Sequence, residues 1–404
     1  MKLQLYRFLI ILVSLPHLLF AQNFNLIDPG TKARSMGGAF IGLADDVTAT
    51  FWNPAGLVQL TGIKGTWDVS FEKYFISTNK KDDFIVMPWK SSHSTWWRFG
   101  GLSYKPIWYP KLVLAIARHP VIDFFHKYDD AEFLDEQTGY INTYSFAFGY
   151  LVYKGLSLGA TFNYYIGKRD FHFYDKSNDG RFGDYNYLEQ YEYNGKNVNM
   201  GVFYSYDDKS DSTAEALFRI GAIFKFPFNL TEKNDDLNYE ATFKMPKMFG
   251  LGIAFRVFNN LVYSIDFESR LFSDSYRTYE KVFRSFKKGN QDYTDLADIK
   301  QLRFGSKYII HIHDVPLFHV GELKLPLYIG VAKTPTIFRD LKENQIKGAR
   351  FTLGLGIQKK HSSFNWELNI GFEYNTYKYY IHDKYQYTEK FRRYLITTSF
   401  QYEQ

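Results

Sequence analysis

The sequence contains no cysteine and no strong excess of charge of either sign. With no cysteine among 404 residues, a disulfide-linked scaffold and thiol chemistry are both excluded. The formal net charge is +6, which is mild for this length, and no cluster of basic residues points to nucleic acid. We therefore expect no nucleic-acid partner.

Sequence signatures of catalysis are also missing. We find no Ser-His-Asp set, no pair of catalytic carboxylates in a defined context, no phosphate-binding loop and no nucleotide fingerprint. The Asp and Glu residues are spread along the chain instead of being gathered into a motif. The sequence thus predicts a protein that is not an enzyme and that needs no organic cofactor.

Long hydrophobic runs are confined to the first 21 residues. The run from Phe8 to Phe20 follows Lys2 and Arg7 and is followed by the small residue Ala21. This arrangement is typical of a secretory signal, which we assign to residues 1–21. The run is shorter than the roughly 20 residues of a membrane-spanning helix, and no later segment supplies one.

Aromatic residues, in contrast, are abundant. They make up 20% of the chain, with 33 Tyr and 39 Phe, although the chain as a whole is slightly hydrophilic. Residues 364–375 show how a chain can be rich in aromatic residues and still be slightly hydrophilic. Every even position there is apolar or aromatic, and every odd position is polar or glycine. Such alternation predicts a strand with one apolar face and one polar face.

Fourteen segments after residue 62 follow this pattern to a greater or lesser degree. They are residues 63–76, 96–105, 111–119, 140–153, 156–173, 196–206, 216–226, 246–257, 260–272, 298–312, 324–333, 349–359, 363–378 and 389–402. The connections between them alternate between short ones, such as 154–155, and long ones, such as 120–139. Outer-membrane barrels have tight turns at one end and long loops at the other.

These features predict the fold class. Strands that face lipid must close on themselves, since lipid offers no hydrogen bonds to a free sheet edge. We expect residues 63–404 to form an all-β, 14-stranded antiparallel transmembrane β-barrel in the bacterial outer membrane. We expect it to be a monomer in contact with membrane lipid.

A barrel of fourteen strands has a lumen that needs an occupant. Eight strands enclose a space that side chains fill, whereas sixteen to eighteen leave an aqueous channel. Residues 22–62 precede the first strand and lack its alternation. We predict that they form a hatch, meaning a plug inside the lumen.

Part of this hatch carries a recognisable pattern. Residues 33–57 read ARSMGGAFIGLADDVTATFWNPAGL, with Gly37 and Gly38 near the start and the triplet Asn53, Pro54 and Ala55 near the end. This pattern, together with the segments at 245–254, 302–308, 325–332 and 351–357, resembles the FadL/TodX-type outer-membrane transporters of hydrophobic compounds.

The resemblance implies a function and a gate. It implies passive uptake of hydrophobic small molecules, such as long-chain fatty acids or aromatic hydrocarbons, through the lumen and out sideways into the membrane. It also implies that Asn53, Pro54 and Ala55 lie against an opening in the barrel wall. Taken alone, the triplet also fits an ordinary Asn-Pro turn.

A second function fits the same resemblance. PorV-type barrels of the type IX secretion machinery share this fold and a similar hatch motif, and they act as docking subunits. The loops of the sequence do not discriminate between uptake and docking, so both functions stay open here.

Four cations are candidates for contact with a ligand head group. Arg256, Arg303, Lys307 and Arg393 all fall on the polar side of their strands. Arg or Lys facing lipid at the midplane would cost about 2–4 kcal/mol, so this side is assigned to the lumen. The sequence does not choose among the four.

One loop resembles a calcium site. Asp175, Ser177, Asp179 and Asp184 place oxygen atoms at spaced positions around Gly180. The twelfth position, where such loops carry a bidentate Glu, holds Asn186. A weak calcium site and a solvated polar turn are both compatible with this loop.

Overall fold

A computed structural model describes most of the chain. It covers residues 25–78, 89–129, 133–176, 186–206, 216–281, 291–293, 296–315, 320–340, 342–361, 363–382 and 385–403. The predicted signal at residues 1–21 lies outside these ranges. Within them, no helix is both long and apolar enough to cross a membrane.

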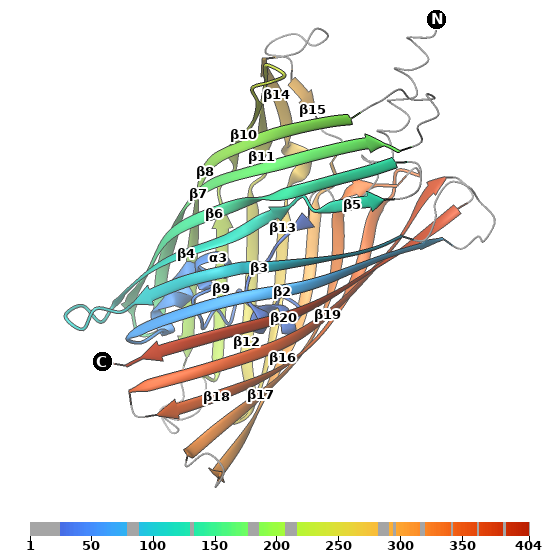
Figure 1. Cartoon of the computed structure of the whole chain (residues 1–404). Coiled ribbons are helices and arrows are strands. Elements are labelled where there is room, and N and C mark those ends of the chain that lie inside the picture. The colour runs from blue at the N-terminus through green and yellow to red at the C-terminus, as the bar shows by residue number, and fades with distance from the viewer. Residues whose placement is uncertain are drawn as a thin grey trace, which may run out of the picture.

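The described strands form one closed antiparallel barrel, tall and strongly tilted (Figure 1). Closure comes from the first and last strands, which pair from Ile63↔Tyr402 to Thr78↔Tyr387. The strands are β2 (Ile63–Thr78), β3 (Trp89–Tyr104), β4 (Leu112–Asp123), β5 (His126–Asp129), β6 (Phe133–Tyr153), β7 (Leu156–Asp175), β8 (Asn186–Tyr206), β9 (Phe218–Lys225), β10 (Phe228–Asn234), β11 (Tyr239–Met245), β12 (Met248–Phe258), β13 (Leu261–Arg270), β14 (Tyr276–Lys281), β15 (Gln291–Tyr293), β16 (Ile299–Val315), β17 (Val320–Arg339), β18 (Gln345–His361), β19 (Phe364–His382) and β20 (Tyr385–Tyr402).

Several of these strands are two halves of one barrel strand. β9 and β10 are separated only by Phe226 and Pro227, and both halves pair with β8. The pairs β4 and β5, β11 and β12, β13 and β14, and β15 and β16 also follow one another along the chain. Counted in this way, the described part of the chain forms fourteen barrel strands, and the predicted fold class is confirmed.

The strands are longer than the sequence predicts. β6 and β8 each have 21 residues, and residues 227–245, predicted as a long loop, are the hairpin of β10 and β11. Backbone pairing continues where the alternation of residue types has ended. The barrel therefore extends well beyond its apolar band.

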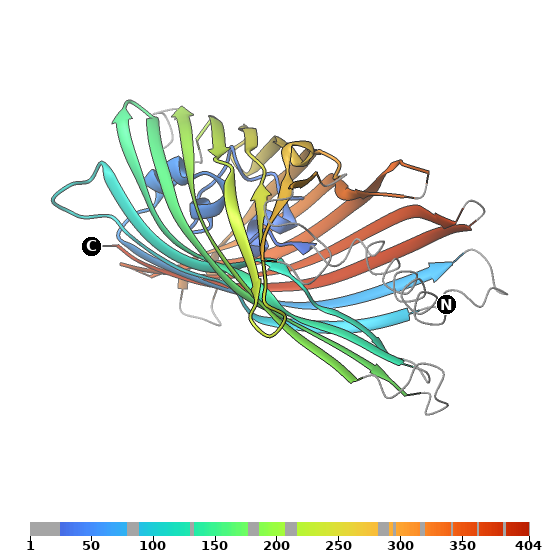
Figure 2. The same cartoon turned by 90° about the horizontal axis from the view of Figure 1, so that it is seen from above.

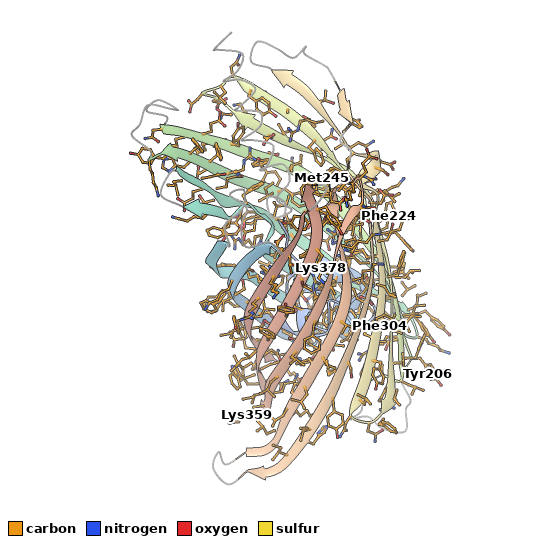
Figure 3. All side chains as sticks on the ribbon, turned by 90° about the vertical axis from the view of Figure 1, so that its right-hand side faces the viewer. Tyr206, Phe224, Met245, Phe304, Lys359 and Lys378 are labelled. Carbon is orange, nitrogen blue, oxygen red and sulfur yellow. The ribbon has the colours of Figure 1, made fainter. Side chains whose placement is uncertain are left out.

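Side chains alternate across the barrel wall as the period of two requires. Outward residues such as Phe304 and Tyr206 are 42% and 53% exposed, and they project from the outer surface in Figure 3. Inward residues such as Glu373 and Asn375 are buried. The outer face is thus apolar and the inner face polar, the reverse of a soluble barrel.

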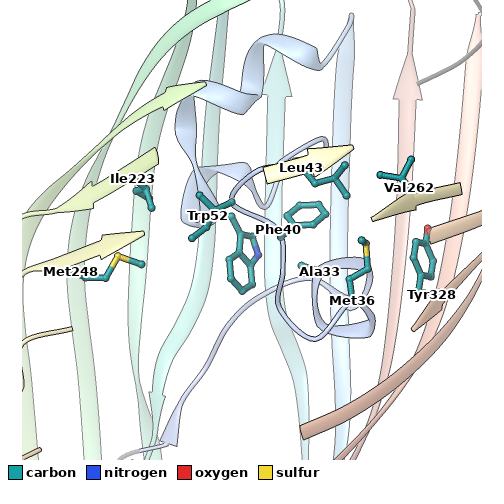
Figure 4. Close-up of a cluster of buried hydrophobic side chains, with 11 residues drawn as sticks. Ala33, Met36, Phe40, Leu43, Trp52, Ile223, Met248, Val262 and Tyr328 are labelled. Carbon is teal, nitrogen blue, oxygen red and sulfur yellow. The ribbon is translucent and has the colours of Figure 1, made fainter. Parts of the chain in front are cut away.

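The N-terminal segment, residues 25–62, lies inside the barrel (Figure 2). It contains β1 (Asn25–Leu26), α2 (Thr31–Ser35), α3 (Ala49–Trp52) and the 3₁₀ turn η2 (Pro54–Gln59). A buried apolar cluster forms its centre, with Met36, Phe40 and Trp52 packed together and toward wall residues such as Ile223 (Figure 4). This cluster joins the segment to the wall.

A row of inward-facing glycines allows the segment to approach the wall closely. If any glycine of this row carried a Cβ atom, that atom would lie at or below van der Waals distance from an atom of the N-terminal segment. We call them the glycine row: Gly149, Gly159, Gly201, Gly221, Gly252, Gly305, Gly330, Gly354 and Gly371. Several of these glycines are direct cross-strand neighbours, such as Gly159 and Gly201. Together they form a surface without side chains, against which the backbone of the N-terminal segment packs.

Candidate functional site

The segment is anchored to the wall by a buried ionic network around Arg34 of α2. Arg34 Nε donates to Glu373 Oε2 on β19 at 2.8 Å, and Arg34 Nη1 donates to Asp28 Oδ2 at 2.9 Å. Glu373 also lies 3.5 Å from Arg350 and 3.4 Å from Arg393. Since these charges are buried, each depends on its partners to remain ionised.

The carboxylates of the N-terminal segment show the effect of these partners. Burial alone would raise the pKa of Asp28. Arg34 and other arginines together lower the pKa by more than burial raises it, so the pKa lies well below its usual range. Burial likewise raises the pKa of Asp45, and Lys32 and Lys307 bring it below its usual value. Both groups therefore stay ionised at any pH above about 4.

Gly37 and Gly38 form the tight turn that follows α2. Their φ angles are +69° and +85°, which glycine adopts without strain. The Gly37 amide donates to Thr352 Oγ1 at 3.0 Å, and a Cβ on Gly37 would lie 2.9 Å from the carbonyl oxygens of Phe304 and Val331. These two glycines therefore seat the turn against β16, β17 and β18.

The triplet Asn53, Pro54 and Ala55 begins η2 and is buried. The Asn53 side chain donates to the carbonyl oxygens of Ile41 at 3.3 Å and Val202 at 3.1 Å, and its Oδ1 accepts from the Ala55 amide. Here β7, β8 and β9 are continuously paired. The structure thus places the triplet against a closed part of the wall, whereas the resemblance implied an opening there.

The interruption in the wall lies between β3 and β4. These strands pair from Tyr104↔Leu114 to Gly100↔Arg118, and in the described residues the pairing goes no further. Beyond that point β1 pairs with the free edge of β4, with Leu26 opposite Ile122. A piece of the N-terminal segment thus closes the wall from inside.

Arg118 closes the same interruption from outside. Its Nη1 donates to the Trp97 carbonyl oxygen on β3 at 2.6 Å, and its Nη2 donates to Asn142 Oδ1 on β6 at 2.6 Å. On the inner side, Arg98 Nη2 donates to the Asp28 carbonyl oxygen at 3.3 Å. Side-chain hydrogen bonds and the short β1–β4 pairing, instead of a ladder between β3 and β4, therefore hold this part of the barrel together.

A small apolar cavity lies between the N-terminal segment and the wall near this interruption. Its volume is about 90 Å³. Its apolar lining comprises Ile27, Phe51, Val121, Ile122, Ile141, Tyr165, Phe228, Leu230, Met245, Pro246, Met248 and Phe272. The rings of Tyr165 and Phe228 are stacked at 4.6 Å between centroids.

The polar side chains that line the cavity are Asn197, Lys225 and Arg270. The Lys225 ammonium lies 3.5 Å from the ring centroid of Phe51, a cation–π contact with the N-terminal segment. Arg270 Nε donates to Glu268 Oε1 at 2.6 Å, which partly neutralises it. Lys225 is therefore the cation best placed to meet an anionic group in the cavity.

The four cations singled out from the sequence face the lumen but not this cavity. Arg303 pairs with Glu268 at 2.9 Å, Lys307 with Asp45 at 3.7 Å, and Arg393 with Glu72. Arg256 lies near the end of β12, and its Nη1 has no hydrogen-bond partner among the described residues. The first three thus hold carboxylates of the protein itself.

Sequence reasoning missed Phe51, Lys225 and Arg118. Lys225 has the inward parity of its strand, so alternation gives its direction but not its height in the barrel. The candidate calcium loop lies largely outside the described residues, including Ser177, Asp179 and Asp184 and the side chain of Asp175. In the ranges that are described, no group of three His, Asp or Glu residues has the arrangement of a metal site.

Comparison with known proteins gives matches in structure alone. No family model and no curated protein matches the sequence. Among solved structures, a FadL homologue from Pseudomonas aeruginosa superimposes with a TM-score of 0.64 at 10% identity, covering 94% of this chain and 99% of that one. The P. putida toluene transporter TodX gives 0.59 at 12% identity, covering 94% and 100%.

The chain has the FadL/TodX-type fold. A further solved structure of this fold, the monoaromatic hydrocarbon channel CymD, has a TM-score of 0.55 at 12% identity and covers 94% of this chain and 99% of its own. The FadL-type fold thus spans the whole described barrel together with its N-terminal segment. At these identities the likeness concerns the fold, and the function requires its own argument.

Proposed function

We propose that this protein is an outer-membrane channel for the passive uptake of hydrophobic small molecules. The observation that carries the proposal is the apolar cavity that lies between the N-terminal segment and the wall, near the interruption between β3 and β4. The apolar outer face of the barrel supports a location in the membrane. The solved structures of the same fold include transporters of toluene and other monoaromatic hydrocarbons.

The size of the cavity favours small ligands. A dry cavity of about 150 Å³ binds benzene in another protein, so a cavity of about 90 Å³ suits a single ring after small side-chain movements. A long-chain fatty acid would require a much larger rearrangement. We therefore propose monocyclic aromatic compounds as the ligand class, ahead of long-chain fatty acids.

The proposed exit is sideways, between β3 and β4. A hydrophobic ligand that leaves the cavity there enters lipid without crossing water, so it avoids the cost of exposure to water, which is about 0.8 kcal/mol per CH₂ group. Leaving requires that β1 separate from β4, which breaks the pairing at Leu26 and Ile122. Under this proposal the gate is residues 25–28, and the Asn53, Pro54 and Ala55 triplet is a fixed anchor of the segment.

Uptake by cells tests the proposal. Cells that lack their own hydrocarbon channels are given labelled toluene or a labelled long-chain fatty acid, with and without this protein. We expect faster accumulation of toluene with the protein. Ile141→Trp fills the cavity and should abolish the gain, whereas Val152→Trp, on the outer face of the same strand, should keep it.

Folding of both variants is checked by the heat-dependent shift of barrels on gels. Equal accumulation of both compounds with and without the protein would contradict the proposal. It would leave the docking barrel of a secretion system as the function to pursue.

A further inference from the structure

The outer face of the barrel carries a row of polar side chains that crosses four neighbouring strands, next to a row of apolar side chains on the same strands. Arg118 on β4, Tyr144 on β6, Tyr164 on β7 and Lys196 on β8 are consecutive cross-strand neighbours. All four point outward, away from the lumen, since they share the parity of the exposed apolar residues. We call these four residues the cationic row.

An apolar groove lies beneath the cationic row. Its floor comes from the next outward residues of the same strands, including Ile116, Phe146 and Phe162, which are 57%, 48% and 50% exposed. The groove is open on its outer side and has a volume of about 990 Å³. A hydrocarbon chain can therefore lie along it.

The positive charge of the row is not balanced by acidic groups. No Asp or Glu is among the residues that line the groove. Arg118 donates hydrogen bonds to the neutral oxygens of Trp97 and Asn142, and the Lys196 ammonium lies 5.5 Å from the ring centroid of Tyr164. By contrast, the outward Lys168 on β7 is paired with Glu192 at 2.9 Å.

The hydroxyl groups between the two cations complete the arrangement. Tyr164 Oη accepts from Asn194 Nδ2 at 2.9 Å, so its own proton is available for another acceptor. Arg118 and Lys196 are three strands apart, which corresponds to about 14 Å at about 4.8 Å per strand. Arginine, lysine and phenolic hydroxyl groups all donate hydrogen bonds to phosphate oxygens.

Membrane physics explains why such a row needs a partner. A cation on the lipid-facing surface is unfavourable within the hydrocarbon region and tolerated near the interface. The neighbouring outward residues on the same strands, Ile116 beside Arg118 and Val198 beside Lys196, are apolar, so we place the two cations at the boundary where a lipid head group meets its chains. An anionic head group would neutralise them, while the chains of the same molecule cover the floor of the groove.

We propose that the cationic row and the groove beneath it bind a membrane lipid with a phosphate head group. The phosphate contacts Lys196 and the neighbouring Tyr164 hydroxyl group, Arg118 attracts it from the other end of the row, and an acyl chain lies over Ile116 and Phe162. The proposal rests on the membrane location given under the proposed function but not on transport. The bound lipid would lie over the paired stretch of β3 and β4, beside the interruption that Arg118 spans.

Native mass spectrometry of the purified full-length protein in a neutral detergent tests this site. The three probes are dioleoyl phosphatidic acid, dioleoylglycerol and inorganic phosphate, which separate the whole lipid from its chains and its head. We expect phosphatidic acid to bind at least about tenfold more tightly than either of the others, a difference of about 1.4 kcal/mol. Tight binding of phosphate alone would instead indicate a simple anion site and would overturn the proposal.

Variants of the row identify the site. Lys196→Gln and the double change of Arg118→Gln with Lys196→Gln should weaken phosphatidic acid binding about tenfold or more, and Arg118→Lys should preserve most of it. Lys168→Gln, the matched control on the same face, should leave binding within about twofold. Unchanged binding in the Lys196 variants, or an equal loss in the Lys168 variant, would overturn the proposal.

The two proposals fail in different ways. Loss of lipid selectivity with intact toluene uptake would contradict the lipid site alone. Selective lipid binding by a protein that does not increase uptake would contradict the transport proposal alone. Lys196 is remote from the β3–β4 pairing, so its variant gives an answer even where Arg118 variants fold poorly.

Discussion

At the scale of single residues, the direction of a side chain and its partner are separate questions. Arg303, Lys307 and Arg393 face the lumen, but each pairs with a carboxylate of the protein. Alternation along a strand sets the direction, whereas the partner depends on how neighbouring strands and the N-terminal segment are aligned in height. This is why parity alone did not distinguish these three from Lys225, which lines the cavity.

Removal of the Arg34 guanidinium should release the N-terminal segment. Arg34→Met leaves Asp28 and Glu373 buried with fewer partners, although Glu373 keeps Arg350 and Arg393 nearby. Breaking a buried ion pair in this way costs about 3–5 kcal/mol of stability. Because the two remaining arginines still neutralise Glu373, we expect a loss near the lower value. Hydrogen exchange of the amides in residues 31–41 should accelerate roughly a hundredfold.

The control for this change is an ion pair whose two side chains are exposed instead of buried. Lys168 and Glu192 are 2.9 Å apart and both side chains are 58% exposed, so Lys168→Met should cost at most about 1 kcal/mol. It should leave exchange in residues 31–41 unchanged. If Arg34→Met also leaves it unchanged, the ionic network does not anchor the segment.

At the scale of strands, the sequence predicted all fourteen but shortened most of them. β10 (Phe228–Asn234) and β11 (Tyr239–Met245) pair along their whole length, yet residues 227–245 do not alternate clearly. Above the apolar band both faces of the sheet meet polar surroundings, so the period of two disappears while the backbone hydrogen bonds continue. A pattern of side chains therefore marks the apolar band and not the end of a strand.

The glycine row belongs to the same scale, because it places strands and segment in contact. A Cβ on Gly159 would clash with the Pro54 carbonyl carbon and the Ala55 amide nitrogen, both backbone atoms with little freedom to move. Gly159→Ala should thus destabilise docking of residues 49–60 by about 1–3 kcal/mol, the usual cost of overpacking. Faster hydrogen exchange in those residues, with the barrel intact on gels, is the expected result.

Gly195→Ala provides the comparison for this variant. Gly195 also faces inward, but its Cβ would meet only barrel atoms of Asn229 and Phe228, at 3.0 Å or more. Exchange in residues 49–60 should not change in that variant. Equal hydrogen-exchange rates of residues 49–60 in the two variants would show that the glycine row tolerates side chains.

At the scale of the whole molecule, the decisive feature is an incomplete ladder closed by the N-terminal segment. β1 occupies the edge of β4 that β3 leaves unpaired. A closed barrel has no free edge, so a short pairing of this kind is the place where the wall separates most readily. The proposed exit follows from this arrangement.

A disulfide across that pairing should block the exit. Leu26 and Ile122 are directly opposite, and antiparallel partners have Cα separations of about 4.5–5.5 Å, within the range that a disulfide bridges. Since the chain has no cysteine of its own, Leu26→Cys with Ile122→Cys introduces the only two thiols. We expect toluene uptake to stop in the oxidised form and to return when a reductant is added.

A second cysteine pair checks that oxidation itself is harmless. Leu158→Cys with Val202→Cys joins β7 and β8, which are already continuously paired, and should not affect uptake in either redox state. If uptake through the Leu26 and Ile122 variant is the same in both states, the ligand does not leave between β3 and β4.

The sequence by itself determined the number of strands, the face that each side chain takes and the presence of a segment without strand character before them. All three depend on patterns within a few neighbouring residues. Only the tertiary structure decided where the ladder is incomplete, which cations are neutralised and where the cavity lies. These depend on contacts between residues far apart in the chain, such as Arg34 with Glu373 and Leu26 with Ile122, and a local period carries no information about them.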